Sequence, residues 1–373
     1  METAAAFLLP FFILVTLVQV AWWRQFGRAF RQLAQSAKNE SSPPPPTSLI
    51  ICARNEAENL KRHLPLFLAQ NHPQFEVVVV NDHSDDKSLD ILLDIQKKHY
   101  NLALVNLSDP VKTGKKVALS AGVEAARFEN LVFSDADCYP ASPNWLSQMS
   151  ALLVDPHSLA LGYGGYQQRA GWLNRWQRFE TIYTAIQYFS FAVFGIPYMG
   201  VGRNLAYRKS LFLRVGGLRG HMHLLSGDDD LFVNQAASAP ITTFTIAPAA
   251  FTWSIPAASL RGYYRQKQRH LSAGRHYRPE HQWLLGSLSI SHLAHYGLGA
   301  TVGWLQPQWW PFLTGMFLAR MAVVFRVGRD ASRLLKAPDL VGWFPLLDLF
   351  LLIYYLLLAP ALFTGSRVVK QWK

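Results

Sequence analysis

The sequence predicts an α/β domain built on a mostly parallel sheet and flanked by transmembrane helices. Short runs of Val, Ile and Leu alternate with stretches whose apolar residues recur every three or four positions, which is typical of a doubly wound sheet. Long uncharged segments lie at both ends of the 373-residue chain. We therefore expect an N-terminal membrane helix with a linker at 1–46, the α/β domain at 47–280, and a membrane region with a basic loop at 281–373.

The composition favours a membrane protein over a purely soluble one. Only 16% of the residues are charged, whereas soluble domains carry about 25%. The net charge of +12 suits an anionic membrane surface or a phosphorylated substrate. The positive charge lies beside the uncharged segments without any nucleic-acid motif, so we expect no nucleic-acid partner. Cys52 and Cys138 lack metal-ligand spacing and are expected to be buried thiols.

The first element is an N-terminal membrane helix. No charged residue occurs from Thr3 to Trp23, and about 20 apolar residues suffice to span a bilayer. Arginines follow directly, so the positive-inside rule places the chain after Trp23 in the cytoplasm. A cleaved signal peptide fits less well, because residue 2 is Glu and no small-residue cleavage site follows. The run SSPPPP at 41–46 is expected to be a short spacer.

Four apolar runs predict buried parallel strands. They are Ser48–Ala53, Glu76–Asp82, Leu102–Leu107 and Asn130–Asp137. The stretches between them, 58–70, 88–99 and 115–126, show helical spacing of their apolar residues. Ligands of such sheets bind at the carboxyl ends of the strands. Functional residues are therefore expected at that edge.

Asp135 and Asp137 end the fourth predicted strand. Side chains two residues apart on a strand point the same way, so both carboxylates are expected to project from one edge of the sheet. Adjacent carboxylates repel unless a cation joins them, and such oxygen ligands bind Mg²⁺ or Mn²⁺. A pair of solvated turn aspartates is the alternative. The strand context favours a metal that also binds substrate phosphates.

Two further charged residues lie at element ends. Asp82 ends the second predicted strand, where a carboxylate can accept hydrogen bonds from a nucleobase or ribose. A helix cap is the alternative for Asp82, although Ser84 or Asp85 suits that role better. Lys115 lies near a predicted helix start, where a lysine disfavours the helix and is expected to face an anion. A solvated charge run is the alternative for Lys115.

Three segments that follow the fourth predicted strand each have two possible roles. The aromatic segment 172–198 can line an acceptor path or pack on the sheet as a helix. Asp228, Asp229 and Asp230 can cap a helix, or hold a general base whose pKa is raised by its neighbours. Residues 261–278 carry cations and tyrosines without an acid. This basic segment can lie on anionic lipid or cover a pyrophosphate.

The last third of the chain returns to the membrane. No Asp, Glu, Lys or Arg occurs within 281–319, which leaves room for two spans separated by 306–308. A further apolar stretch at 341–363 is interrupted only by Asp348, and the basic loop at 326–336 is expected to be cytoplasmic. A complete last span would put the basic C-terminal residues outside. Either that stretch is re-entrant or interfacial, or a weaker span does not cross.

Taken in order, these motifs resemble glycosyltransferase family 2. The matching elements are ICARNEAENL (51–60) as the first nucleotide-binding loop, Gly114-Lys115 with Ala118-Leu119 as GK-x-x-AL, Asp135 and Asp137 as D-x-D, 200–217 as G-x-G-x-N…R…GG, Asp228-Asp229 as ED, and QKQRH (266–270) as Q-x-x-R-W. His270 replaces the tryptophan, which weakens the inference of a processive polysaccharide synthase. Asp228 replaces the glutamate, so the register within the aspartates is open by one residue.

The resemblance implies a GT-A fold, Rossmann-like, and an inverting, metal-dependent hexosyltransferase in the cell membrane. It would be multi-pass, face the cytoplasm, contact membrane lipids, and move a sugar from a nucleotide-sugar donor to a lipid-linked or membrane glycan acceptor. Asp229 would be the base, with Asp228 beside it, and Asp137 with Asp135 would bind Mg²⁺ or Mn²⁺. The implied substrate-binding residues are Ala53, Asn55, Glu56, Asp82, Lys115, Asp135, Asn204, Gln266, Arg269 and His270.

Two other functions compete with this one. A sugar nucleotidyltransferase-like enzyme would use a related sheet, but no Gly- and Arg-rich triphosphate loop follows the first predicted strand. A non-catalytic nucleotide-binding membrane scaffold would show the same motifs and release no nucleoside diphosphate from a sugar donor.

Overall fold

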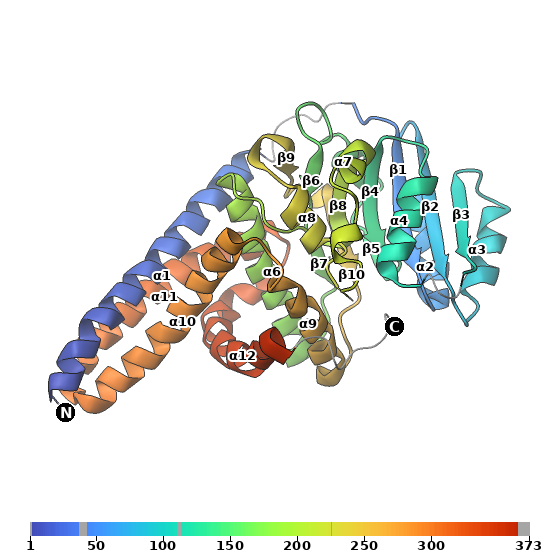
Figure 1. Ribbon diagram of the computed structural model, residues 1–373. Helices are drawn as coiled ribbons and strands as arrows, with labels where there is room; N and C mark the ends of the chain where they lie inside the picture. Colours follow the sequence, from blue (N-terminus) through green and yellow to red (C-terminus); the bar gives the residue numbers. More distant parts are fainter. Residues whose placement is uncertain (1, 37–42, 110–112, 225, 365–373) are drawn as a thin grey trace.

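A computed structural model shows an α/β domain from which a bundle of long helices extends (Figure 1). The structure describes residues 2–36, 43–109, 113–224 and 226–364. The first two residues of the expected spacer and the basic C-terminal residues lie outside the described residues.

The larger sheet carries the predicted parallel strands at its centre. Its strand order is β3-β2-β1-β4-β8-β6-β9. The pairs β3–β2, β2–β1 and β1–β4 are parallel, and β8 runs antiparallel to both β4 and β6. The bounds are β1 Thr47–Ala53, β2 Phe75–Asp82, β3 Leu102–Leu107, β4 Asn130–Asp135, β6 Leu159–Leu161, β8 Leu205–Arg208 and β9 Thr242–Phe244. The mostly parallel sheet is therefore confirmed, with β4 ending two residues earlier than expected.

A smaller sheet follows directly from the end of β4. Its order is β5-β10-β7, with β10 antiparallel to β5 and parallel to β7. Its strands are β5 Cys138–Pro140, β7 Gly164–Tyr166 and β10 Thr252–Ser254. This sheet forms a wall beside the carboxyl ends of the parallel strands.

Helices cover both faces of the larger sheet. They are α2 Ala57–Leu68, α3 Ser88–Gln96, α4 Lys115–Ala125, α5 Trp145–Ser150, α6 Trp172–Val193, α7 Lys209–Arg214 and α8 Asp230–Ala236. Successive residues of a strand point to opposite faces, and β1 shows the consequence. Leu49 and Ile51 pack in the core that holds α2 and α5, whereas Ile50 and Cys52 pack in the core that holds α4, α6 and α8.

Four long helices and one basic helix complete the chain. They are α1 Glu2–Ser36, α9 Leu260–Gly274, α10 Pro279–Leu305, α11 Trp310–Leu334 and α12 Phe344–Thr364. Figure 1 shows α1, α10 and α11 running side by side away from the sheets. The turn between α10 and α11 lies at 306–309, where the sequence predicts a break.

Among the described residues, three segments are long and apolar enough to cross a membrane. They are Phe7–Gln35, Pro307–Leu334 and Pro338–Leu358. α10 forms a 27-residue helix where a span is expected, but it does not reach the hydropathy of these three segments. Polar residues such as His292 and His295 account for this difference.

The helices and the α/β domain share one core. The cluster that contains Phe133 of β4 also includes Trp23 of α1, Val324 of α11 and Leu347 of α12. α12 packs against α9 and α6 as well as against α11. The domain is therefore fixed against these helices by continuous apolar packing, which favours a single arrangement.

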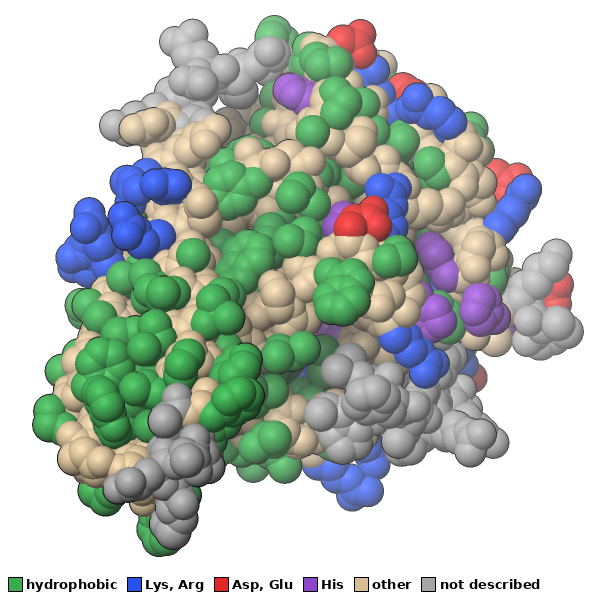
Figure 2. Space-filling model, turned by 60° about the vertical axis from the view of Figure 1, so that its left-hand side comes forward, with side chains coloured by type: hydrophobic (Ala, Val, Ile, Leu, Met, Phe, Trp, Pro, Cys, Tyr) green, Lys and Arg blue, Asp and Glu red, His purple; other side chains and the backbone are tan. Residues whose placement is uncertain are grey.

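The outer surface of the helices is apolar. Exposed large side chains include Phe7, Phe11, Leu14, Trp304 and Leu318. Figure 2 shows apolar side chains gathered over one end of the molecule, with lysine and arginine side chains beside them. A contiguous exposed apolar surface marks contact with lipid or with another protein.

Candidate active site

A cavity of about 310 Å³ lies at the carboxyl ends of the parallel strands. Its walls come from the end of β4, the start of α4, the acidic cluster before α8, and the helices α6, α9 and α12. The expected site residues that line it are Glu56, Lys115, Asp135, Asp137, Asp228, Asp229, Gln266, Arg269 and His270. Folding thus brings together motifs that are far apart in the sequence.

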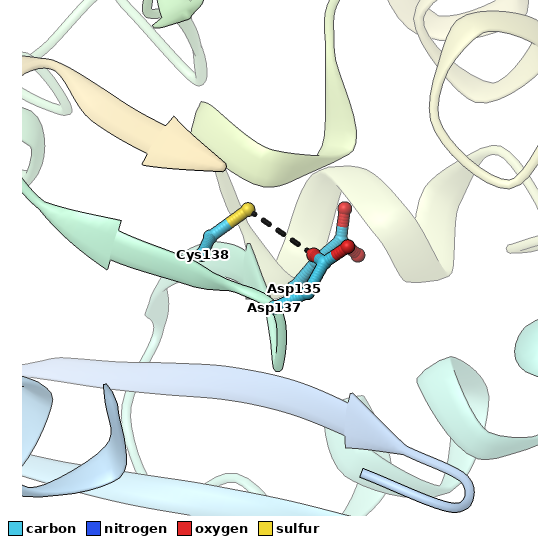
Figure 3. A group of neighbouring side chains, drawn as sticks. All are labelled: Asp135, Asp137 and Cys138. Carbon is cyan, nitrogen blue, oxygen red and sulfur yellow. Dashed lines mark hydrogen bonds between the residues drawn. The ribbon is translucent and has the colours of Figure 1, made fainter. Parts of the chain in front are cut away.

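Asp135 and Asp137 meet for a different reason than the sequence suggests. β4 ends at Asp135, and Asp137 lies in the turn that leads into β5, so the expectation that both belong to one strand is wrong. The turn folds the chain back and places the second carboxylate beside the first. Ligand atoms of Asp135, Asp137 and Cys138 all lie within 4.8 Å of one another (Figure 3).

This carboxylate pair fits a hard divalent cation. Oxygen ligands of this kind bind Mg²⁺ or Mn²⁺, with open positions left for substrate phosphates. Burial, together with the charge of Asp137, holds the pKa of the Cys138 thiol well above its usual range. The thiol therefore stays protonated, and its Sγ donates to Asp137 Oδ1 at 3.5 Å. Cys138 therefore supports the Asp137 carboxylate through this hydrogen bond.

Lys115 joins two acidic groups at the start of α4. Its Nζ lies 2.9 Å from Asp135 Oδ1 and 2.8 Å from Asp228 Oδ2. Burial alone would lower the pKa of Lys115, but the charges of Asp135 and Asp228 hold it well above its usual range. The side chain is thus a fixed ammonium, and its neighbours in this structure are the protein's own carboxylates.

The three adjacent aspartates have different partners. Asp228 is paired with Lys115. Asp229 accepts hydrogen bonds from the backbone N–H of Gly202 at 2.5 Å and of Asp230 at 2.8 Å, which makes it the cap of α8. Asp230 is buried and accepts a hydrogen bond from the hydroxyl of Tyr277 at 2.7 Å. The expected helix cap is present, and each carboxylate is held in place.

These partners separate the proton affinities of the aspartates. Burial alone would raise the pKa of Asp228, but the Lys115 charge brings it below its usual value. Burial and the charge of Asp228 raise the pKa of Asp229 to about 6. Burial and the charge of Asp229 raise the pKa of Asp230 to about 7. A carboxylate with a pKa near 6 is suited to accept a proton at neutral pH. Asp229 is also less buried than Asp230.

α9 turns one face of the basic segment toward the cavity. Gln266, Arg269 and His270 line the cavity, and Gln266 Nε2 donates to the hydroxyl of Tyr166 at 3.3 Å. Arg261 and Arg265 of the same helix are exposed. One side of α9 therefore lines the cavity, while Arg261 and Arg265 are exposed; contact with a pyrophosphate or with lipid stays a prediction.

Of the residues expected to bind the nucleoside, Glu56 lines the cavity, whereas Ala53, Asn55 and Asp82 lie outside its lining. Ala53 is buried at the end of β1, and Asn55 adopts a positive φ of 56° in the turn that follows. Asp82 is fully buried and accepts hydrogen bonds from Gly114 N at 2.9 Å and Thr113 Oγ1 at 3.1 Å. In this structure, Asp82 therefore holds the loop that precedes α4.

Asn204 is used by the fold itself. Its side chain is fully buried, and Nδ2 donates to the carbonyls of Tyr163 and Ala250 at 2.8 and 2.7 Å. Its Oδ1 accepts a hydrogen bond from Trp145 Nε1 at 3.0 Å. Each polar atom of the amide thus has a protein partner, and Asn204 positions segments around β8 rather than facing the cavity.

Residues that were not among the expected site residues also line the cavity. Glu180 of α6 and Lys267 of α9 form an ion pair there, and the hydroxyl of Tyr354 on α12 lies 3.5 Å from Glu180 Oε1. Phe179 and Ile182 of α6 pack in the core. The segment 172–198 therefore packs as a helix and also contributes to the cavity wall, whereas its role as an acceptor path stays a prediction. For Glu180, the sequence offered a signal, because it is a lone glutamate among aromatic residues. For Tyr354 it offered no signal, because this tyrosine lies in a run of leucines.

Comparison with known proteins relates part of this chain to a family. Residues 48–216 match the family model described as glycosyl transferase family 2. The matched segment includes β1, β4 and the carboxylate pair. The three aspartates and α9 follow after its end.

Curated relatives match shorter segments. The chain is 31% identical over 100 residues to a poly-beta-1,6-N-acetyl-D-glucosamine synthase of Staphylococcus epidermidis, which covers 27% of this chain and 24% of that protein. It is 35% identical over 114 residues to a dolichyl-phosphate beta-glucosyltransferase of Drosophila melanogaster, which covers 28% of this chain and 35% of that protein. The chain thus spans about a quarter to a third of the length of these relatives.

One solved structure resembles nearly the whole chain. A mannosyltransferase from Pyrobaculum calidifontis, in complex with GDP-Man and Mn²⁺, aligns with a TM-score of 0.57 and 20% identity. The alignment covers 97% of this chain and 96% of that one. At this identity, the likeness concerns the fold, which is that of a GT-A enzyme including its helical part.

Proposed function

Because residues 48–216 match the glycosyl transferase family 2 model, we propose that the chain transfers a sugar from a nucleoside diphosphate sugar to an acceptor held at the membrane. The single observation that carries this proposal is the composition of one cavity wall. The cavity that holds Asp135, Asp137 and Asp229 is also lined by Tyr354, which lies within the candidate span Pro338–Leu358. The polar end of a lipid-linked substrate would therefore reach the carboxylates while its lipid part stays in the bilayer.

The donor would bind at the carboxylate pair. Asp135 and Asp137 would hold a divalent cation, which when bound neutralises diphosphate charge and favours departure of the nucleotide. The metal-containing mannosyltransferase of similar fold supports Mn²⁺ as one choice, and Mg²⁺ has the same ligand preference. Ala53, Asn55 and Glu56, at and just after the end of β1, together with Asp82 at the end of β2, lie where a nucleoside would be expected at this sheet edge.

Asp229 would act as the general base. Direct attack by an acceptor hydroxyl requires loss of its proton, and a positioned carboxylate can take it. Attack on the face opposite the leaving diphosphate inverts the configuration at the sugar carbon. Asp228 is a poorer base because Lys115 neutralises it, and Asp230 is buried against Tyr277. Asp229 combines access to the cavity with a pKa raised to about 6 by burial and by Asp228.

Cations around the cavity would stabilise the departing nucleotide. Lys115, Arg269 and His270 line the cavity, and fixed positive groups stabilise charge that develops in the transition state. Lys115 is held by two carboxylates, so its position requires no rearrangement during the reaction. Gln266, hydrogen-bonded to Tyr166, would orient hydroxyls of a bound sugar.

The acceptor would be lipid-linked or a membrane glycan. The dolichyl-phosphate glucosyltransferase relative supports a lipid phosphate, and the polysaccharide synthase relative supports a glycan. The α12 wall and the exposed apolar surface of the helices favour an acceptor that stays in the bilayer. Glu180 and Lys267, paired inside the cavity, would contact its polar end.

The protein would be multi-pass with its α/β domain in the cytoplasm. A cysteine-labelling experiment tests this orientation, because the native Cys52 and Cys138 are buried. With a probe that cannot cross the membrane, Lys87→Cys on the domain should stay unlabelled in intact cells. Gln308→Cys, at the turn between α10 and α11, should be labelled. The reverse pattern would overturn the orientation.

A donor screen tests the proposed activity. Detergent-solubilised protein, membrane lipid extract and Mn²⁺ or Mg²⁺ would be combined with a panel of UDP- and GDP-sugars, and release of nucleoside diphosphate measured. Release that requires the lipid extract supports the proposal. Asp94→Asn on α3, an exposed carboxylate, serves as a control that should keep full activity. Binding of a nucleotide without release from any donor would indicate a non-catalytic scaffold instead.

A further inference from the structure

We propose that Arg203 is a preformed binding site for a phosphate group of the substrate. The proposal deepens the proposed function and rests on it, since it names a residue that would contact the phosphorylated substrate. Arg203 lies in the short helical turn Gly202–Asn204 that leads into β8, and it lines the cavity.

The backbone of Arg203 lies between the carboxylate pair and the proposed base. Its carbonyl accepts a hydrogen bond from Ser134 Oγ at 3.2 Å, and Ser134 directly precedes Asp135. The preceding residue, Gly202, donates its N–H to Asp229 Oδ2 at 2.5 Å. Arg203 therefore comes from the segment that joins the two halves of the site, where the reacting groups would meet.

Uncharged groups hold the Arg203 side chain in one position. Nε donates to the carbonyl of Gly164 at 3.0 Å, Nη1 lies 3.4 Å from Ser254 Oγ, and the guanidinium lies 4.7 Å from the centre of the Tyr166 ring. A Cβ added to Gly164 would lie 2.5 Å from Arg203 Nε. A residue without a side chain at 164 is thus what allows the arginine to lie there.

The charge of Arg203 has no counter-ion in the part of the chain that the structure describes. No carboxylate there forms an ion pair with it, whereas the cavity lysines Lys115 and Lys267 are each paired with an acid. Arg203 is half-buried, and a cation that is partly withdrawn from water without a counter-ion is unfavourable. A planar guanidinium matches two oxygens of a phosphate. A substrate phosphate would supply the missing anion.

The phosphate could come from either substrate. The donor carries a diphosphate, and a lipid-linked acceptor can carry a phosphate of its own. A purely structural role is the competing explanation, because Arg203 also connects Gly164 of β7 with Ser254 of β10. That role predicts a loss of stability without a change in phosphate affinity.

Binding measurements on the full-length protein in detergent distinguish these cases. Calorimetry would give the Kd of UDP and GDP with Mn²⁺, and of farnesyl phosphate with farnesol as the uncharged control. We expect Arg203→Gln to weaken at least one phosphate ligand by about 10-fold or more, as for loss of a charged hydrogen bond. Arg203→Lys should be intermediate, because lysine keeps the charge but not the planar fork.

Two further variants separate position from charge. Gly164→Ala keeps the arginine but displaces its side chain, so it should weaken the same ligand. Arg175→Gln is the matched control, since Arg175 lies 4.4 Å over the Trp343 ring and does not line the cavity. Its affinities should equal those of the wild type, as should farnesol binding in every variant.

The results either identify which substrate phosphate binds Arg203 or overturn the proposal. Weaker UDP or GDP binding places the donor diphosphate at Arg203, and weaker farnesyl phosphate binding alone places the acceptor phosphate there. Unchanged affinities in Arg203→Gln, with a lower melting temperature, would overturn the proposal and leave a structural clamp. A wild-type protein that binds none of these ligands would overturn the proposed function together with the arginine site.

Discussion

Arg320 of α11 and Asp348 of α12 form a fully buried, bidentate ion pair. Arg320 Nη1 donates to Asp348 Oδ2 at 2.6 Å and Nη2 to Oδ1 at 3.2 Å, and both side chains are 0% exposed. Gln19 of α1 and Tyr296 of α10 complete the hydrogen bonds. The aspartate that interrupts the last apolar stretch therefore links α12 to the other long helices. Six residues further on, Tyr354 lines the cavity.

Breaking this pair should destabilise the protein. Asp348→Leu leaves Arg320 as an uncompensated buried charge, which costs about 3–5 kcal/mol. The double variant Arg320→Leu/Asp348→Leu removes both charges and should recover most of that loss, because apolar replacements of buried pairs are often neutral. Thermal unfolding in detergent measures both effects. A double variant no more stable than Asp348→Leu would show that the hydrogen bonds around the pair, and not the lone charge, dominate.

Asp229→Asn tests the proposed base. Asparagine caps a helix about as well as aspartate, but it cannot accept the acceptor proton. Turnover at saturating donor should fall by roughly 10²–10⁴-fold, the usual contribution of general base catalysis, while the donor Kd stays near that of the wild type. Because Asp229 also accepts from Gly202 N, the melting temperature must be measured alongside. A stable and fully active variant would move the assignment to Asp228 or Asp230.

The pH profile of turnover should show an acidic limb near pH 6. Burial and the Asp228 charge raise the pKa of Asp229 to about 6, and the base works only when it is ionised. The rate should therefore fall about tenfold per pH unit below that value and level off above it. Asp228→Asn removes a neighbouring negative charge, so it should shift the limb to lower pH. A limb that stays in place in this variant would contradict the role of Asp229.

Metal dependence should follow the carboxylate pair. Nucleoside diphosphate binding should need Mn²⁺ or Mg²⁺, and EDTA should abolish most of it, because bare carboxylates repel a diphosphate. Asp137→Ala should lose the metal dependence and most of the affinity. Calorimetry with and without EDTA measures both. Asp94→Ala, which changes an exposed carboxylate on α3, is the control, and nucleotide affinity unaffected by EDTA would exclude the metal site.

Strand and helix patterns in the sequence were sufficient to predict much of the domain. β1 is buried along its whole length, as its run of apolar residues predicts. The helices α2, α3 and α4 lie where the apolar residues recur every three or four positions. The carboxylate pair was also predictable, although for the wrong reason, since a turn rather than a strand brings Asp137 to Asp135. Local sequence specifies which residue types stand at a strand end, but not how the chain turns after it.

By itself, the sequence determined the parallel sheet, the membrane-type helices, the resemblance to glycosyltransferase family 2 and most of the acidic and basic residues that line the cavity. These properties depend on local patterns of two to twenty residues, which a sequence displays directly. Only the tertiary structure decided which aspartate is neutralised by Lys115. It also showed that the side chains of Asn204 and Asp82 form hydrogen bonds within the protein, and that Tyr354 lines the cavity. Each of these depends on contacts between distant segments, where burial and the nearest charge, and not the residue type, set a side chain's partner and its proton affinity.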